Sequence, residues 1–242
     1  MMLEVANKEG GTRQSVLVVG TGVVGMATAY ALARRGLSVT LVDQASGVGQ
    51  GASFANGAQL SYAYTDALAN PKLLRHMPAL ALGMDPVFRL KASADPQYIG
   101  WLLRFLRNCT RDRALESTLS GLTLGLESRL AMHALLALHP LDFGHKAPGK
   151  LHLYKDKPSF AGAAMMARLK TAHGAQQHVL GRQEALDIEP ALAAYTDDFL
   201  GAIYSPEDEL GDPHRFCAAL LDVLIQSYGV KLRTGVRVAE IR

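Results

Sequence analysis

The sequence is poor in cysteine, in net charge and in long apolar runs, and each shortage excludes a class of protein. Cys109 and Cys217 are the only two cysteines in 242 residues, and they match no CxxC or Cys/His ligand spacing. We therefore expect reduced thiols in a cytosolic protein rather than a disulfide framework. The formal net charge is only +3. This charge is too small to argue by itself for a nucleic-acid partner.

Hydrophobic residues account for 49% of the chain, which is typical of a globular protein and excludes a disordered tail or a collagen. At about 150 residues per domain, the length predicts one large domain or two small ones. Residues 1–14 are polar and are predicted to be a disordered extension. The sequence shows no internal repeat and no low-complexity tract.

An uncharged stretch over residues 15–33 resembles a signal peptide or a membrane span at first sight. A span needs about 20 strongly apolar residues, whereas this stretch divides into shorter parts. Residues 16–19, three valines and a leucine, suit a buried parallel strand. Residues 26–35 are rich in alanine and predict a helix that Gly36 ends. Residues 38–42 predict a second strand, which a targeting segment does not require.

The turn GTGVVG joins the first strand to the helix, and the second strand ends on Asp43. A GxGxxG turn in this context, with an acid about 20 residues further on, is the dinucleotide-binding fingerprint. Gly20 permits the tight turn, Gly22 lets a pyrophosphate approach the backbone, and Gly25 lets the helix pack closely. The helix N-terminus offers unpaired N–H groups to phosphates. Asp43 is predicted to bind a ribose, and its charge argues against NADP.

A glycine-rich helix start that binds no ligand is the alternative interpretation of this turn. The fingerprint also does not separate NAD from FAD. Between Gln44 and Lys150 the only valine and isoleucine residues are Val48, Val87 and Ile99, so the third strand of a simple NAD domain is not expected there. We therefore predict an interrupted sheet, which suits a two-domain flavoprotein better than a nicotinamide dehydrogenase.

A loop of small residues follows over residues 44–61. Its polar side chains can hydrogen-bond a cofactor, and a plain surface connection is an equal alternative. Beyond this loop, Asp95 and Asp212 each precede a proline and are predicted N-caps. The pattern predicts helices over residues 96–108, 111–138, 158–172, 184–192 and 213–229, and strands over residues 151–154, 201–204, 230–233 and 236–241.

The first of these helices carries an aromatic stripe beside several arginines. Such a stripe either docks on an anionic membrane surface or packs against the core of the protein, and the second interpretation is the more common one. The stripe consists of Tyr98, Trp101, Leu102 and Phe105, and the nearby arginines are Arg104, Arg107, Arg111 and Arg113.

Glu207, Asp208, Glu209 and Asp212 form an acidic cluster, for which we weighed an acid–base or cation site. A solvated turn followed by the Asp212 N-cap is the simpler interpretation and is favoured here. The histidines, including His133, His139, His145 and His214, show no HExxH or other ligand spacing, and no metal is predicted.

Together these motifs resemble the FAD-dependent D-amino acid oxidase superfamily, and within it the branch of the bacterial D-amino acid dehydrogenase small subunits. That branch often has Ala then Gly after the loop asparagine, where this sequence has Gly57 and Ala58. The resemblance is carried by VLVVGTGVVGMATAYALARRG at 16–36, LVDQ at 41–44, SFANGAQLS at 53–61, WLLRFLRNC at 101–109 and GAIYSPEDELGDPHRF at 201–216.

The resemblance implies that the cofactor is FAD. It also implies a reaction in which a D-amino acid loses hydride to the flavin, the imine hydrolyses to a 2-oxo acid and ammonia, and the electrons pass to a membrane quinone. Asp43 and Gln44 match the ribose site, the loop from Ser53 matches the segment nearest the flavin, and Val238 matches a strand residue beside the adenine. The implied cofactor residues are Val18, Gly20, Thr21, Gly22, Val23, Val24, Gly25, Asp43, Gln44, Ser53, Asn56, Gly57, Gln59 and Val238.

The resemblance implies an α/β fold, in which a mixed α+β substrate domain interrupts a Rossmann-type FAD-binding domain. We assign residues 15–61 and 200–242 to the FAD domain and residues 62–199 to the inserted domain. Relatives continue well past residue 242, so the expectation is an N-terminal part of the enzyme, without the C-terminal part of the fold. The expected location is the cytoplasm, with peripheral contact at the inner face of the membrane.

No catalytic residue is assigned from the sequence. The family implies an arginine that grips the substrate carboxylate, and Arg75, Arg89 and Arg182 cannot be told apart. Two other functions stay open, a non-catalytic nucleotide-binding remnant and a related FAD amine oxidase of the glycine or sarcosine type. A nicotinamide dehydrogenase is the least favoured alternative.

Overall fold

The computed structural model describes residues 14–74, 93–195 and 198–240, and the chain forms two compact units. The predicted domain bounds differ from these units, because residues 132–148 belong to unit 1 and residues 200–207 to unit 2. Unit 1 comprises Met1–Leu60, Met132–Pro148 and Asp208–Arg242, and unit 2 comprises Ser61–Ala131 and Gly149–Glu207.

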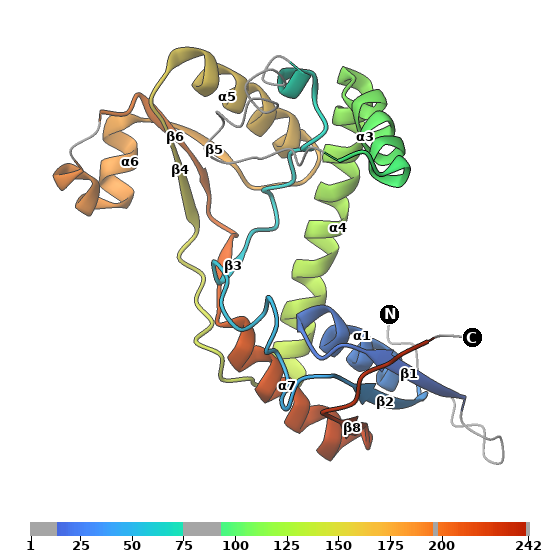
Figure 1. Cartoon of the computed structure of the whole chain (residues 1–242). Coiled ribbons are helices and arrows are strands. Elements are labelled where there is room, and N and C mark those ends of the chain that lie inside the picture. Colours follow the sequence, from blue (N-terminus) through green and yellow to red (C-terminus); the bar gives the residue numbers. More distant parts are fainter. Residues whose placement is uncertain (1–13, 75–92, 196–197, 241–242) are drawn as a thin grey trace. The chain divides into compact units, whose positions relative to one another are not determined.

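Unit 1 is built on a parallel sheet of three strands in the order β1-β2-β8 (Figure 1). The strands are β1 (Ser15–Val19), β2 (Ser38–Val42) and β8 (Lys231–Arg233). Helix α1 (Val23–Arg34) joins the first two strands, and helix α7 (Pro213–Tyr228) leads into the third. The predicted α/β class is confirmed, and the third strand of the sheet comes only after the long insertion.

The core of unit 1 lies on one face of this sheet. Met26 of α1, Leu41 of β2 and Leu220 of α7 are fully buried there. On the opposite face, Leu17 and Val19 are 56% and 54% exposed. All-parallel sheets usually have both faces covered, so this face is unusual in the part of the chain that the structure describes.

A short ribbon also belongs to unit 1. It pairs β3 (Gln59–Leu60) with β7 (Glu209–Leu210) in antiparallel fashion. Neither strand was predicted, because two residues are too few to show an alternating pattern.

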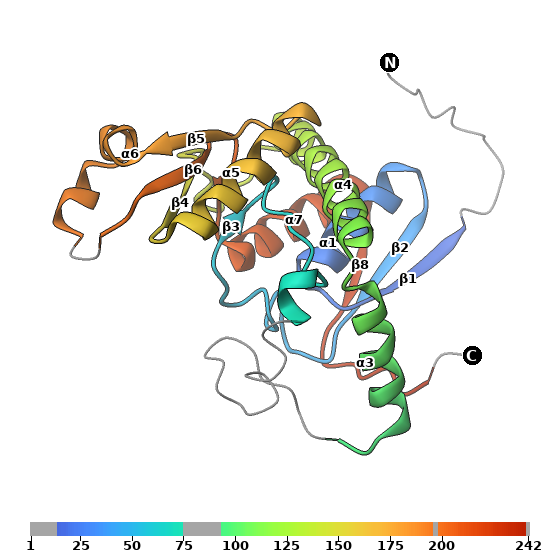
Figure 2. The same cartoon turned by 90° about the horizontal axis from the view of Figure 1, so that it is seen from above.

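Unit 2 contains an antiparallel sheet in the order β4-β6-β5, which Figure 2 shows from above. Its longest helix, α4, continues from Met132 into unit 1. The sheet strands are β4 (Lys150–Tyr154), β6 (Gly201–Ser205) and β5 (His178–Gly181), and the helices are α3 (Pro96–Asn108), α4 (Arg111–Leu138), α5 (Lys157–Ala172), α6 (Arg182–Ile188) and the 3₁₀ helix η1 (Pro190–Ala194).

The predicted N-caps of α3 and α7 are confirmed. Asp95 accepts a hydrogen bond from the Gln97 amide at 2.8 Å, and Asp212 accepts from the amides of His214 and Arg215. Each carboxylate satisfies N–H groups that the first turn of a helix leaves without a partner.

The strand predicted over residues 236–241 is wrong for residues 236–240, which form no strand. Gly235 has a φ of 68°, which turns the chain just after β8. The Val236 amide then donates to the Asp43 carbonyl at 2.9 Å. The segment after β8 is therefore joined to the end of β2 by the backbone hydrogen bond of Val236 rather than by a strand ladder.

Two glycines inside α4 mark the place where the segment after β3 crosses the helix. A Cβ atom on Gly125 would lie 2.2 Å from the Tyr62 carbonyl oxygen, and one on Gly121 would lie 3.3 Å from Cβ of Thr65. The hydroxyl of Thr65 also donates to the carbonyl of Thr118. The glycines thus permit a close crossing, at the expense of some helix propensity.

Replacing Gly125 by alanine is expected to destabilise unit 2 by about 2 kcal/mol, because a backbone carbonyl cannot move aside easily. Gly100 of α3, whose Cβ would meet nothing within 4 Å, is the matched control. Gly100→Ala should stabilise its helix by up to about 1 kcal/mol. Urea unfolding followed by circular dichroism measures both changes, and equal effects of the two variants would contradict the close crossing.

Candidate functional site

The glycine turn follows β1 and opens α1, as its sequence predicts. Gly20 has a φ of 99° and donates its amide to the Val42 carbonyl at 2.8 Å. A Cβ atom on Gly25 would lie 1.9 Å from the Gly20 carbonyl oxygen. Gly22 is the N-cap of α1 and provides no side-chain cap, and the first helical turn contains no acidic residue. The positive end of α1 is therefore not neutralised by a side chain of its own first turn.

Asp43 ties this turn to the end of β2. Its Oδ2 atom accepts hydrogen bonds from the Thr21 amide and the Thr21 hydroxyl, both at 2.7 Å. Its Oδ1 atom accepts from the Ala45 amide at 2.9 Å. Burial raises the pKa of Asp43, but the hydrogen bonds from Ala45 and Thr21 outweigh burial and hold its pKa below the usual value. The carboxylate is therefore charged at neutral pH.

The loop after Asp43 lies against the same turn. The Gly49 amide donates to the Thr21 carbonyl at 3.0 Å. The Ser53 hydroxyl accepts from the Val23 amide at 3.1 Å, at the N-terminus of α1. A Cβ atom on Gly22 would lie 3.1 Å from that hydroxyl oxygen. The structure thus brings Ser53 to the helix end where a diphosphate is predicted to bind.

Ala58 has a φ of 52°, a left-handed conformation that glycine adopts more readily. Its amide donates to the Asn56 side chain at 2.8 Å, and its carbonyl accepts from the Gly211 amide at 2.9 Å. These two bonds hold a conformation that costs alanine about 1 kcal/mol. The reversed order of Gly57 and Ala58 therefore has a structural cost, since alanine stands at the left-handed position.

The remaining predicted cofactor residues lie outside the group formed by the glycine turn, Asp43 and Ser53. Val18 packs against the core of unit 1, and Val24 is 77% exposed on α1. Gln44 is exposed directly after Asp43. Gln59 begins β3. Val238 is half-buried in the segment after β8.

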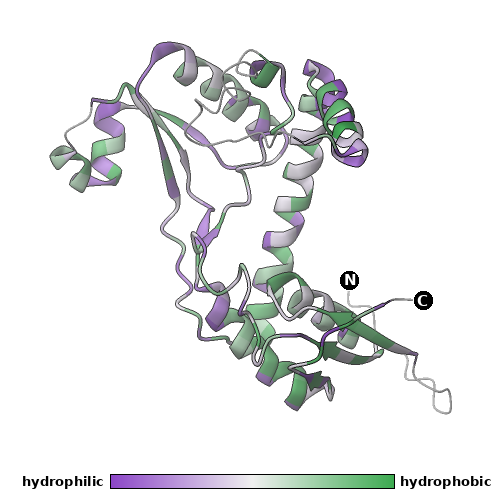
Figure 3. Ribbon diagram, viewed as in Figure 1, coloured by the Kyte–Doolittle hydropathy of each residue, from purple (hydrophilic) through white to green (hydrophobic). Residues whose placement is uncertain are grey.

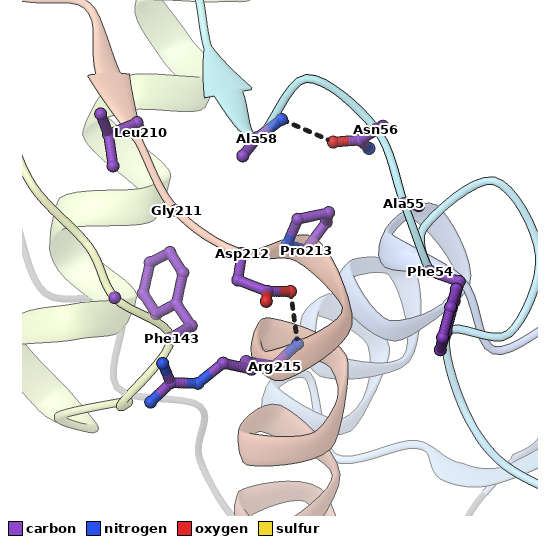
Figure 4. A pocket seen from close by; sticks show the side chains of 11 residues that line it. Phe54, Ala55, Asn56, Ala58, Phe143, Leu210, Gly211, Asp212, Pro213 and Arg215 are labelled. Atoms are coloured by element: carbon purple, nitrogen blue, oxygen red, sulfur yellow. Dashed lines mark hydrogen bonds between the residues drawn. The ribbon is translucent and has the colours of Figure 1, made fainter.

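A pocket of about 310 Å³ lies beside the loop that carries Asn56. Phe54 and Phe143 stand on opposite sides of it (Figure 4). Arg215 contributes a guanidinium group that also pairs with Asp142 at 2.8 Å. Phe54 is 62% exposed at the edge of this pocket, whereas Phe143 is buried.

The solvated turn predicted for the acidic cluster is wrong for Asp208 and Glu209, which are 2% and 7% exposed. Glu209 lies in β7, and its two carboxylate oxygens contact ring nitrogens of His133 at 2.5 Å and His145 at 2.8 Å. Sequence reasoning missed this group. The three residues are far apart in the chain, and only the fold brings them together.

Of the three arginines considered as substrate ligands, Arg182 is already engaged. It forms an ion pair with Asp198 and lies over the Phe199 ring at 4.8 Å. Arg75 and Arg89 lie outside the described residues.

Among residues 14–74, 93–195 and 198–240, no group of three or more His, Cys, Asp or Glu side chains could hold a metal ion. Within the same ranges, no helix has both the length and the apolarity to cross a bilayer. Both cysteines are buried and free, and burial raises the pKa of Cys217 to about 11. A buried thiol of this kind is a poor nucleophile.

A family model described as DAO, FAD dependent oxidoreductase, matches residues 15–242. The chain belongs to this family. The prediction of FAD as the cofactor is thereby confirmed at the level of the family, as is the assignment to FAD-dependent oxidoreductases. The glycine turn, the unneutralised end of α1 and the charged Asp43 fit a dinucleotide without a 2′-phosphate.

Similar curated proteins are named D-amino acid dehydrogenases. The chain is 43% identical over 219 residues to D-amino acid dehydrogenase 2 of Ralstonia nicotianae, covering 90% of this chain and 52% of that protein. It is 37% identical over 227 residues to the D-amino acid dehydrogenase of Paramagnetospirillum magneticum, covering 93% and 54%. The chain therefore spans about half the length of the curated relatives it matches.

Solved structures with the same fold include glycine oxidase from Geobacillus kaustophilus, with a TM-score of 0.63 and 22% identity. L-proline dehydrogenase from P. horikoshii has a TM-score of 0.66 and 18% identity. Each match covers 96% of this chain, and 49% and 47% of those chains respectively. At these identities the likeness establishes the fold alone.

We expect Asp43→Asn to lower the free energy of unfolding at pH 7 by about 1–3 kcal/mol, because an amide cannot accept every bond that the carboxylate accepts. The folded-state pKa of Asp43 is lowered, so its contribution is present above the unfolded pKa and is lost as pH falls through the folded pKa. The difference between wild type and variant should therefore shrink as the pH is lowered into the acidic range.

Denaturant unfolding at neutral and acidic pH measures this difference. Asp222→Asn is the matched control, because Asp222 is an exposed acid of α7 in the same unit. A difference that stays constant with pH, or that Asp222→Asn reproduces, would contradict the role given to Asp43.

Proposed function

We propose that the whole protein to which this chain corresponds oxidises D-amino acids with FAD. The observation that carries the proposal is the glycine turn fastened to Asp43, in a chain 43% identical to a protein named D-amino acid dehydrogenase 2. The family supports the coarser statement, an FAD-dependent oxidoreductase. The substrate class, the electron acceptor and the membrane contact are part of the proposal.

In the proposed reaction, the amino acid loses two electrons and two protons and becomes an imino acid. Water then converts the imino acid to a 2-oxo acid and ammonia. FAD supplies the two-electron acceptor when it is bound. A quinone-type acceptor that takes up two electrons and two protons becomes the hydroquinone, which balances the reaction.

The residues of the chain bind and orient the cofactor in this proposal. Gly20, Gly22 and Gly25 let the diphosphate approach the N-terminus of α1. Asp43 accepts hydrogen bonds from the ribose, and its own bonds to Thr21 fix its orientation. The other proposed contacts are Val18, Val23 and Val24 around the turn, Gln44 beside the ribose, Ser53 near the diphosphate, Asn56, Gly57 and Gln59 toward the flavin, and Val238 toward the adenine.

An amine oxidase of the glycine or sarcosine type is the second candidate. The fold shared with glycine oxidase supports it, at a TM-score of 0.63. The higher sequence identity to proteins named D-amino acid dehydrogenases favours the first candidate. Peroxide formation with glycine or sarcosine separates the two.

Gly22→Ala is expected to weaken FAD binding at least tenfold, because a Cβ atom would fill the space through which the diphosphate approaches the backbone. Quenching of FAD fluorescence on titration with purified protein measures the affinity. Gly51→Ala is the control, since a Cβ atom on Gly51 would meet nothing within 4 Å. Equal affinity of the two variants, or tighter binding of NADP than of FAD, would contradict the assigned site.

The activity is tested by reduction of a dye with D-alanine as the donor. We would assay this chain alone and also co-expressed with the second half of the Ralstonia nicotianae relative, because the exposed Leu17 and Val19 face offers a surface for further sequence. We expect dye reduction in the second preparation, with no peroxide. Bound FAD without reduction by any amino acid in either preparation would support a non-catalytic nucleotide-binding protein instead.

A further inference from the structure

Three polar side chains from distant parts of unit 1 meet beside β7, and we call them the Glu209 cluster. The Glu209 side chain is buried, and its oxygens lie 2.5 Å from Nε2 of His133 and 2.8 Å from Nε2 of His145. A carboxylate oxygen accepts, so each imidazole presents an N–H group to it. Burying a carboxylate is costly unless it is hydrogen-bonded. The two histidines therefore hold Glu209 in one place.

Apolar packing does little to fix β7, which makes the Glu209 cluster important for this strand. Among the residues that the structure describes, neither Glu209 nor Leu210 belongs to the apolar core of unit 1. Figure 3 shows the contrast between the hydrophobic strand β1 and the hydrophilic stretch that leads into β7. The position of β7 therefore depends on polar contacts.

Hydrogen bonds pass the position of β7 on to the loop over residues 53–60. Glu209 is paired with Leu60 in the ribbon of β7 and β3. Two residues after Glu209, the Gly211 amide donates to the Ala58 carbonyl at 2.9 Å. Ala58 is left-handed, and its amide donates to the Asn56 side chain (Figure 4). A strained alanine persists only where its surroundings hold it, so the loop depends on β7.

On its other side, β7 is bonded to the segment that carries His145. Leu210 and Lys146 exchange two backbone hydrogen bonds, of 2.9 and 3.0 Å. The Asp212 amide donates to the Phe143 carbonyl at 2.8 Å. The Glu209 cluster adds a side-chain connection to this segment and, through His133, extends it to α4.

We infer that Glu209 is a positioning residue for the loop over residues 53–60. It acts through the backbone of β7, and His133 and His145 fix its carboxylate. The inference rests on the proposed function, which directs this loop toward the flavin. It goes further, because it gives a role to three residues that are not among the proposed cofactor contacts.

His133→Leu and His145→Leu each remove one N–H donor from the Glu209 cluster. His133→Gln and His145→Gln are the conservative variants, because the glutamine amide offers an N–H group near the position of Nε2. His139→Leu is the matched control, since it removes a 3.0 Å contact with Tyr228 elsewhere in unit 1. Circular dichroism checks that each variant is folded.

The first readout is amide hydrogen exchange of the full chain without added FAD. We expect each leucine variant to raise the exchange rate over residues 53–60 by about fivefold, because one hydrogen bond that restrains local opening is lost. Each glutamine variant should restore the wild-type rate. His139→Leu should leave this segment unchanged, and the exchange over β2 serves as an internal reference.

The second readout compares the affinities for FAD and ADP, measured by isothermal titration calorimetry. ADP has the diphosphate and the ribose but lacks the flavin, so it does not reach the loop over residues 53–60. The leucine variants should weaken FAD binding by about fivefold and leave ADP binding unchanged. A general loss of structure in unit 1 would weaken both ligands alike.

The inference is overturned if the leucine variants leave the exchange over residues 53–60 unchanged, or if His139→Leu reproduces their effect. Glutamine variants that behave like the leucine variants, or equal losses of FAD and ADP affinity, also overturn it. A wild-type chain that binds no FAD contradicts the proposed function instead. The exchange rates then decide by themselves whether Glu209 positions the loop, so the two failures are distinguishable.

Discussion

The contact between Thr21 and Asp43 is the constraint on which the rest of unit 1 depends. Through its side chain, Asp43 holds the turn before α1. Through its backbone, it donates to Arg233 of β8 and accepts from Val236 beyond it. One residue thus joins the first strand, the second strand and the end of the described chain. A charged carboxylate in this position sets both the shape and the negative potential of the predicted ribose site.

The long insertion is compatible with this arrangement because parallel strands require only a crossover connection, whatever its length. The chain leaves unit 1 after β3, passes through it again over residues 132–148, and returns for the last time just before β7. Strands β3 and β7 pair with each other, so hydrogen bonds join the first departure point to the final return point. Unit 2 can then carry its own antiparallel sheet without disturbing the parallel one.

The acidic segment is the reverse of what its local pattern indicates, because Asp208 and Glu209 match a solvated turn but are 2% and 7% exposed. In the aromatic stripe of α3, Trp101 is 49% exposed, whereas Tyr98, Leu102 and Phe105 are half-buried. A local pattern reports the polarity of an element, and it does not report which other element faces it. The two histidines that contact Glu209 lie on α4 and on the loop after it, beyond the reach of any local pattern.

The sequence by itself determined the parts whose physics is local. The β-branched run of β1, the GxGxxG spacing, the acid that ends β2 and the N-caps Asp95 and Asp212 each follow from neighbours within a few residues. Only the tertiary structure decided that β8 pairs with β2 and that the Ser53 hydroxyl contacts the N-terminus of α1. It also decided that the segment containing Tyr62 crosses α4 at Gly125. Those outcomes depend on contacts between distant segments, because packing and hydrogen bonding across the fold are settled only when the whole chain is in place.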